Sequence, residues 1–228
     1  MPARVALSAT LAITLFMAAP SLGAVSTQAS STSADASGVQ RTARIVTRPV
    51  TEAGAPSPGV LVTNDAQAGP VDCGTADPSP GAVSRDIEFC TPSAAYAVAC
   101  WDAATPREVL CSRDPRSDRV YALPRTDKFA PTGLPEQAKR APLLLVLGNG
   151  TVCLIRDGGA WNTLKSHPSW YGTYGCRNGT AVWSPQNAPH MGINETHPTW
   201  TVRVAPITGD GHVTVRTVRK AYFVGTHS

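Results

Sequence analysis

The sequence predicts a mainly β protein, in which antiparallel hairpins form a small sandwich or barrel-like domain, stapled by disulfides, after a disordered N-terminal tail. Three observations carry this prediction: Asn-Gly and other glycine turns between short β-prone runs, six cysteines that all follow residue 70, and a region before them without aromatic residues. The expected order is a signal peptide (1–24), a tail (25–70) and one domain (71–228), with sub-lobes 71–140 and 141–228.

Residues 1–24 have the order of segments found in a secretory signal. Arg4 supplies a positive start, residues 6–19 are uncharged and apolar, and small residues at 21–24 offer a cleavage site. The apolar run is shorter than the roughly 20 residues that a membrane-spanning helix needs. We therefore expect a secreted, extracellular or cell-envelope-associated protein with no membrane span after signal removal.

Residues 25–70 are dominated by Ser, Thr, Ala, Gly and Pro and contain no Trp, Tyr, Phe or Cys. Such a stretch buries too little apolar surface to offset the entropy lost on ordering it. It is expected to be disordered, although residues 39–50 offer one short segment that could pair as an edge strand.

Sub-lobe 141–228 is predicted to consist of hairpins. Asn149-Gly150 and Asn178-Gly179 each separate two β-prone runs, and a third turn is expected around Gly209-Asp210-Gly211. We interpret the asparagines of the sequons at 149, 178 and 194 chiefly as turn residues. The expected strands are 143–147, 151–156, 170–176, 180–183, 200–207, 212–219 and 221–224.

Sub-lobe 71–140 is harder to assign. Residues 91–112 contain two helix-start patterns, Thr91-Pro92 and Thr105-Pro106-Arg107-Glu108, but Tyr96, Val98 and Cys100 alternate as in a strand. The alternation favours strands at about 96–101 and 108–111. The proline-rich stretch 124–142 is expected to be a surface excursion with one helical turn at 135–140.

The even number of cysteines predicts three disulfides formed in an oxidising compartment. We expect Cys153–Cys176 first, because these residues lie on adjacent predicted strands. Cys73–Cys90 and Cys100–Cys111 follow as neighbours in sequence. None of the cysteines forms a Cys-x-x-Cys pair, so zinc-finger and thioredoxin-like sites have no support.

Two candidate sites emerge from residue types. The loop containing His190, Glu195 and His197 could hold a metal or do acid–base work, although its spacing matches no helical ligand motif and a solvated loop is the alternative. Trp170 and Tyr174 are expected on one face of a strand and Tyr171 on the other, forming a strip that could stack on a ligand. The interpretation that we favour is that these rings belong to the core, because tryptophan is large and usually mostly buried.

Three segments, 156–161, 200–202 and 221–226, resemble small secreted proteins of actinobacteria. These proteins are uncharacterised, so the resemblance implies export and bacterial origin and assigns no activity or functional residue.

The remaining evidence narrows the function by exclusion. A net charge of +4 without basic runs excludes a nucleic-acid-binding role, and no serine-nucleophile elbow or phosphate loop is present. We expect a secreted or envelope-associated, non-enzymatic binding module without cofactor, whose partner is cell-envelope polysaccharide or another protein. The alternatives are a secreted hydrolase using the His190–Glu195–His197 loop, and a secreted inhibitor or structural protein.

Overall fold

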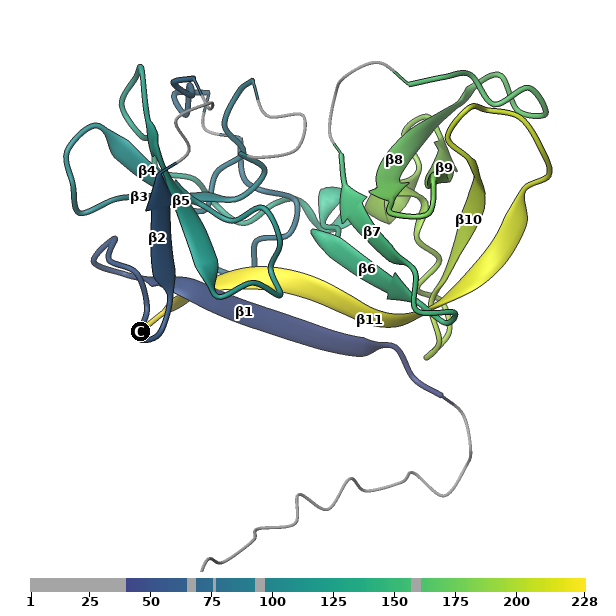
Figure 1. The fold of residues 1–228 in the computed structure, drawn as a ribbon, viewed down its shortest axis with the longest axis horizontal. Helices are drawn as coiled ribbons and strands as arrows, with labels where there is room; N and C mark the ends of the chain where they lie inside the picture. The colour runs from purple at the N-terminus through teal and green to yellow at the C-terminus, as the bar shows by residue number, and fades with distance from the viewer. Residues whose placement is uncertain (1–39, 65–68, 76, 93–96, 157–160) are drawn as a thin grey trace, which may run out of the picture. The chain divides into compact units, whose positions relative to one another are not determined.

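The computed structural model describes residues 40–64, 69–75, 77–92, 97–156 and 161–228. The expected signal peptide, residues 1–24, lies outside the described residues. The strands of the described residues form two sheets (Figure 1), one of seven strands and one of four. Within the described residues, no helix is long and apolar enough to cross a membrane.

Six antiparallel strands of the larger sheet close into a barrel, because the last of them pairs with both the fifth and the first. Each strand follows its neighbour in the sequence, and this order gives an up-and-down barrel (Figure 1). The barrel strands are β6 (Leu144–Leu147), β7 (Val152–Ile155), β8 (Trp170–Cys176), β9 (Thr180–Pro185), β10 (Thr201–Pro206) and β11 (Thr214–His227). The prediction of a β-rich, barrel-like domain built from hairpins is confirmed.

The barrel hairpins form where the turn chemistry predicts them. Gly150 and Gly179 have φ values of +84° and +75°, which favour glycine, and each follows an asparagine. Val202 and Val204 alternate with exposed Arg203 on β10 and join the interior core. The core therefore arises from strands that alternate between an apolar interior face and a more polar exterior.

The expectation of a disordered stretch up to residue 70 is wrong for residues 43–51 and 61–64. β1 (Ala43–Thr51) pairs in parallel with β11, from Ala43 opposite Lys220 to Thr51 opposite His227. β2 (Leu61–Asn64) pairs in parallel with a strand of the smaller sheet. The composition of these segments did not reveal their partners, because the pairing surface lies far away in the sequence.

The smaller sheet has the strand order β2-β5-β4-β3, with β3 (Cys100–Asp102), β4 (Glu108–Cys111) and β5 (Arg119–Pro124). The choice of strands within 91–112 is confirmed for 100–102 and 108–111, although the first strand begins later than expected. The predicted helical turn is present as η1 (Gln137–Lys139). A second short 3-10 segment, η2 (Pro189–Gly192), precedes β10.

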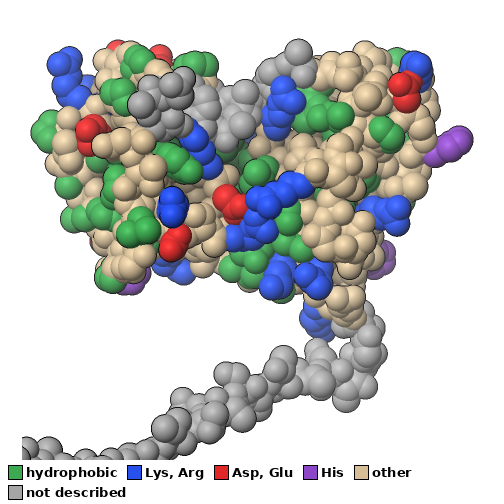
Figure 2. Space-filling model, in the orientation of Figure 1, with side chains coloured by type: hydrophobic (Ala, Val, Ile, Leu, Met, Phe, Trp, Pro, Cys, Tyr) green, Lys and Arg blue, Asp and Glu red, His purple; other side chains and the backbone are tan. Residues whose placement is uncertain are grey.

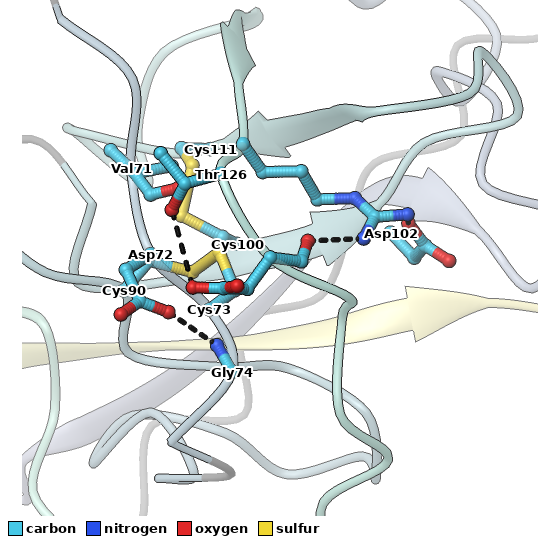
Figure 3. Close-up of a disulfide and its surroundings, with 11 residues drawn as sticks. Val71, Asp72, Cys73, Gly74, Cys90, Cys100, Asp102, Cys111 and Thr126 are labelled. Atoms are coloured by element: carbon cyan, nitrogen blue, oxygen red, sulfur yellow. Dashed lines mark hydrogen bonds and ion pairs between the residues drawn. A yellow bond between two sulfur atoms is a disulfide. The ribbon is translucent and has the colours of Figure 1, made fainter.

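All three predicted disulfides are confirmed: Cys73–Cys90, Cys100–Cys111 and Cys153–Cys176. Cys153 and Cys176 face each other across β7 and β8, and Cys100 and Cys111 across β3 and β4. The first two bridges lie near each other (Figure 3) and form half of the eight-residue buried cluster on one face of the smaller sheet. Such bonds are typical of proteins that fold in an oxidising compartment.

Candidate functional site

A cleft of about 610 Å³ lies where the end of β1 meets the smaller sheet. Its lining includes the acidic residues Glu52, Asp86 and Asp102 and the rings of Trp101 and Phe129. We call this feature the acidic cleft. Its volume is in the range of sites that accommodate small molecules or short peptide segments.

The turn after β1 packs directly on the end of β3 and forms one wall of the acidic cleft. Gly54 has a φ of +73°, and a Cβ atom there would lie 2.5 Å from the Asp102 carbonyl oxygen. The Ala104 N–H donates a hydrogen bond of 2.9 Å to the Gly54 carbonyl. A glycine is therefore required at position 54 to bring Glu52 and Asp102 to the same cleft.

Backbone contacts hold Asp86 on the opposite wall. Its Oδ1 accepts the Thr132 N–H at 2.9 Å, and its own N–H donates to the Thr132 carbonyl at 3.1 Å. Asp86 has a φ of +59°, a region that asparagine and aspartate occupy more readily than most residues. Asp102, on β3, forms an ion pair of 3.3 Å with Arg125 and is still half exposed.

Trp101 supplies a buried aromatic surface to the acidic cleft. The residue is only 3% exposed, and its indole N–H has no acceptor among the described residues. Buried indole N–H groups usually donate a hydrogen bond, since an unmet donor costs free energy. A residue of the cleft wall thus carries a buried donor to which the described residues offer no acceptor.

Behind the cleft, Glu88 is buried completely. Its carboxyl oxygens make no well-formed hydrogen bond with the described residues. The Ala130 N–H donates to the Cys73 carbonyl at 3.4 Å and is close enough to Glu88 to lower its pKa in part. Burial, followed by the negative charges of Asp102 and Asp86, raises the pKa of Glu88 to about 8. Glu88 therefore carries a proton at neutral pH. The contribution of Asp102 and Asp86 to its raised pKa indicates a negative electrostatic potential on this side of the cleft.

Glu88 also lies against a disulfide. Its carboxylate and the sulfur atoms of Cys73 and Cys90 lie within 4.8 Å of one another, the arrangement of three potential metal ligands. Both sulfur atoms are bonded in the Cys73–Cys90 disulfide and are not available as thiolates. This group therefore does not form a metal site in the oxidised protein.

The expected aromatic strip does not form. A register shift in β8 between Gly172 and Tyr174 reverses the alternation of faces, so Trp170 and Tyr174 belong to different clusters. Tyr174 is fully buried in the barrel, where its hydroxyl donates to the Pro142 carbonyl at 2.8 Å. Trp170 and Tyr171 are partly buried. The prediction that Trp170 and Tyr174 share one face is wrong.

Trp170 instead belongs to an aromatic cluster outside the barrel. Its ring lies 4.1 Å from that of His167, and Arg203 lies 5.3 Å above it. In the same cluster, Trp161 contacts buried Trp183 edge to face at 6.3 Å. A segment preceding β8 therefore covers the outer face of the barrel with its own small apolar core.

The structure brings only some residues of the histidine loop together. Burial raises the pKa of Glu195, and the charges of His190 and Arg44 lower it in part, so these groups are near one another. The His190 Nδ1 lies 2.9 Å from the Arg140 carbonyl, whereas His197 is exposed. Among the described residues, His190, Glu195 and His197 do not gather into a set of three ligands.

Sequence reasoning did not identify the acidic cleft. Its acidic residues come from segments at 52, 86 and 102, and no spacing motif connects them. A weak signal was present in the adjacent pair Trp101-Asp102 at the end of a predicted strand. The meeting of three distant segments becomes evident only from the fold.

Comparison with protein families, with characterised proteins and with solved structures finds no match for this chain. The candidate site therefore has to be judged on its own geometry.

Proposed function

We propose that the protein is a secreted or envelope-associated binding module that captures its ligand in the acidic cleft. The observation that carries the proposal is the combination, in one cleft of about 610 Å³, of aromatic surface and three carboxylates. Sites that bind ligands typically combine an apolar lining with a few polar groups of this kind.

A rigid frame supports the cleft, as a preformed binding site requires. Trp101 and Asp102 directly follow Cys100, which is bridged to Cys111 on the neighbouring strand. The Glu88 backbone pairs with Cys100 on the other side through two hydrogen bonds of 2.9 Å. A ligand that enters such a site does not have to order it, and this reduces the entropic cost of binding.

The position of Glu88 favours binding over catalysis. A protonated carboxyl group next to a cleft resembles a general acid, but a general acid must come within hydrogen-bond distance of the reacting atom. Glu88 has no exposed surface and is not part of the cleft lining. Its role in this proposal is confined to the wall behind the site.

Export of the protein is part of the same proposal. The signal-like sequence at 1–24 and the three disulfides support it. A mass spectrum of the protein recovered from culture medium should lack roughly the first 24 residues. Recovery of the protein with Met1 intact would contradict the export pathway.

NMR titration tests the binding site directly. The indole N–H signals of the five tryptophans would be assigned through single Trp→Phe variants, and three probes added: a lysine–glycine pentapeptide, a glutamate–glycine pentapeptide and a chitooligosaccharide. We expect at least one probe to shift the Trp101 signal and leave the Trp161 signal, on the barrel exterior, unchanged. Failure of every probe to move Trp101 would contradict the proposed site.

A further inference from the structure

Resting on the proposed function, we propose that the acidic cleft binds a segment of a protein partner that carries lysine or arginine side chains. The charge of the cleft lining is the first support. Exposed Glu52, Asp86 and Asp102 face a single basic residue, Arg85, in the described lining. The ion pair with Arg125 leaves the Asp102 side chain 53% exposed and able to accept a second cation.

The contrast with the rest of the surface strengthens this inference. The whole chain carries a net charge of +4, and the face drawn in Figure 2 shows many more basic than acidic side chains. Asp102 and Asp86 are close enough to the buried Glu88 to disfavour its ionisation. A cationic ligand would therefore be attracted to the cleft and repelled by much of the remaining surface.

Cleft size and apolar content favour a peptide over a lone cation. A single ammonium or guanidinium group would occupy a small part of the cavity of about 610 Å³. Phe129 and Pro131 offer apolar surface to the methylene stems of lysine or arginine, which commonly pack in this way. The carboxylates on separate walls can then take the charged ends of the side chains.

Size and charge number also distinguish a peptide from a free diamine. A diamine would fill a small part of the cavity of about 610 Å³ and bring two cations to three carboxylates. A longer basic peptide can bring a cation to each of Glu52, Asp86 and Asp102.

Calorimetric titration of the full mature chain tests this assignment. The probes are an N-acetylated, C-amidated pentapeptide of alternating lysine and glycine, its glutamate counterpart, and cadaverine as a free diamine. We expect the lysine peptide to bind about tenfold or more tightly than either of the others, with an affinity that falls as salt is added. Equal affinities for the lysine and glutamate peptides would overturn the proposal.

Variants connect the binding to the cleft. The double variant Glu52→Gln/Asp86→Asn keeps side-chain size and the hydrogen-bond acceptor for Thr132, and should weaken the lysine peptide about tenfold. The control Glu136→Gln removes an exposed carboxylate on the segment before η1 and should change the affinity less than twofold. An unchanged affinity in the double variant, or cadaverine binding as tightly as the peptide, would refute the inference. If only the oligosaccharide shifts the Trp101 signal, the peptide inference fails while the proposed binding site stands.

Discussion

The barrel and the smaller sheet are stabilised in different ways. The barrel strands are hairpin neighbours around a large apolar interior, with one disulfide between β7 and β8. The smaller sheet combines strands as far apart as β2 and β5. Trp101, Leu110 and Val120 on one of its faces join the same large apolar cluster, whereas four of the eight residues of the cluster on its other face are cysteines. Packing dominates the first region, and covalent links add to packing in the second.

This difference explains where the unusual chemistry lies. A closed barrel with a continuous core leaves few buried polar groups without partners. Around the smaller sheet, isolated bridges and loops replace regular pairing, and it is there that Glu88 and the Trp101 indole are left unsatisfied. The disulfides allow this region to tolerate polar groups that a purely apolar core of its size would not support.

Removal of the largest fully buried side chain should destabilise the barrel most. Trp183 has no exposed surface, and its indole donates to the Ala205 carbonyl at 3.3 Å. Trp183→Ala is expected to cost about 3–5 kcal/mol in the free energy of unfolding, measured by denaturant titration. Trp161→Ala, which removes its partly exposed neighbour, serves as the control and should cost less. Equal losses would show that partly exposed Trp161 is as important to the fold as fully buried Trp183.

The raised pKa of Glu88 predicts that the stability of the region around the smaller sheet depends on pH. Its pKa is about 8 in the folded protein against 4.5 for the free side chain, so the folded state binds the proton more tightly. The part of the stability that depends on the Glu88 proton should therefore be fully present at or below about pH 4.5 and be lost as the pH rises through 8, by on the order of a few kcal/mol. Glu88→Gln should remove this slope in thermal or chemical unfolding.

A matched substitution keeps the Glu88 prediction specific. Glu136→Gln removes an exposed carboxylate and should leave the slope between pH 4.5 and pH 8 in place. The same slope in Glu88→Gln as in the parent protein would place the titrating group elsewhere.

The two regions also differ in how far sequence predicted them. Local signals gave the barrel: Asn149-Gly150 and Asn178-Gly179 mark tight turns, and each hairpin is complete within a short stretch of chain. β1 was anticipated only as a segment at 39–50 that could pair as an edge strand, and its partner was not predicted because β11 lies more than 150 residues away. Sequence patterns encode turn geometry well and carry little information about such distant pairings.

The candidate sites follow the same rule. Cys73–Cys90 and Cys100–Cys111 were predicted as neighbours in sequence, and Cys153–Cys176 was predicted because its cysteines lie on adjacent predicted strands. The prediction of an aromatic strip is wrong because a bulge in β8 places Trp170 and Tyr174 on opposite faces. No residue pattern in the sequence predicts this bulge. The acidic cleft escaped prediction because its residues converge from separate segments.

Removal of individual disulfides should show how far the barrel and the smaller sheet each depend on covalent links. Each bridge closes a loop of 11 to 23 residues, for which chain entropy predicts about 3 kcal/mol of stabilisation. Cys153→Ala/Cys176→Ala should lower overall stability and leave the barrel folded. Cys73→Ala/Cys90→Ala should in addition raise amide exchange throughout β3, β4 and β5. Hydrogen exchange with mass spectrometry makes the measurement, and uniform exchange changes in both variants would contradict the distinction.

The smallest expected effect concerns Trp170, on the exterior of the barrel. Its ring is partly exposed and rests on His167 at 4.1 Å and below Arg203 at 5.3 Å, so truncation leaves no closed cavity. Trp170→Ala should therefore lower the free energy of unfolding by only about 1–2 kcal/mol, well below the loss expected for Trp183→Ala. The melting temperature measures this directly, and peptide affinity measured on the same variant should be unchanged, because Trp170 is not part of the acidic cleft. A loss as large as that of Trp183→Ala would mean that Trp170 is as important to the exterior cluster as fully buried Trp183. Unchanged stability with weaker peptide binding would instead move the ligand site to this outer aromatic cluster.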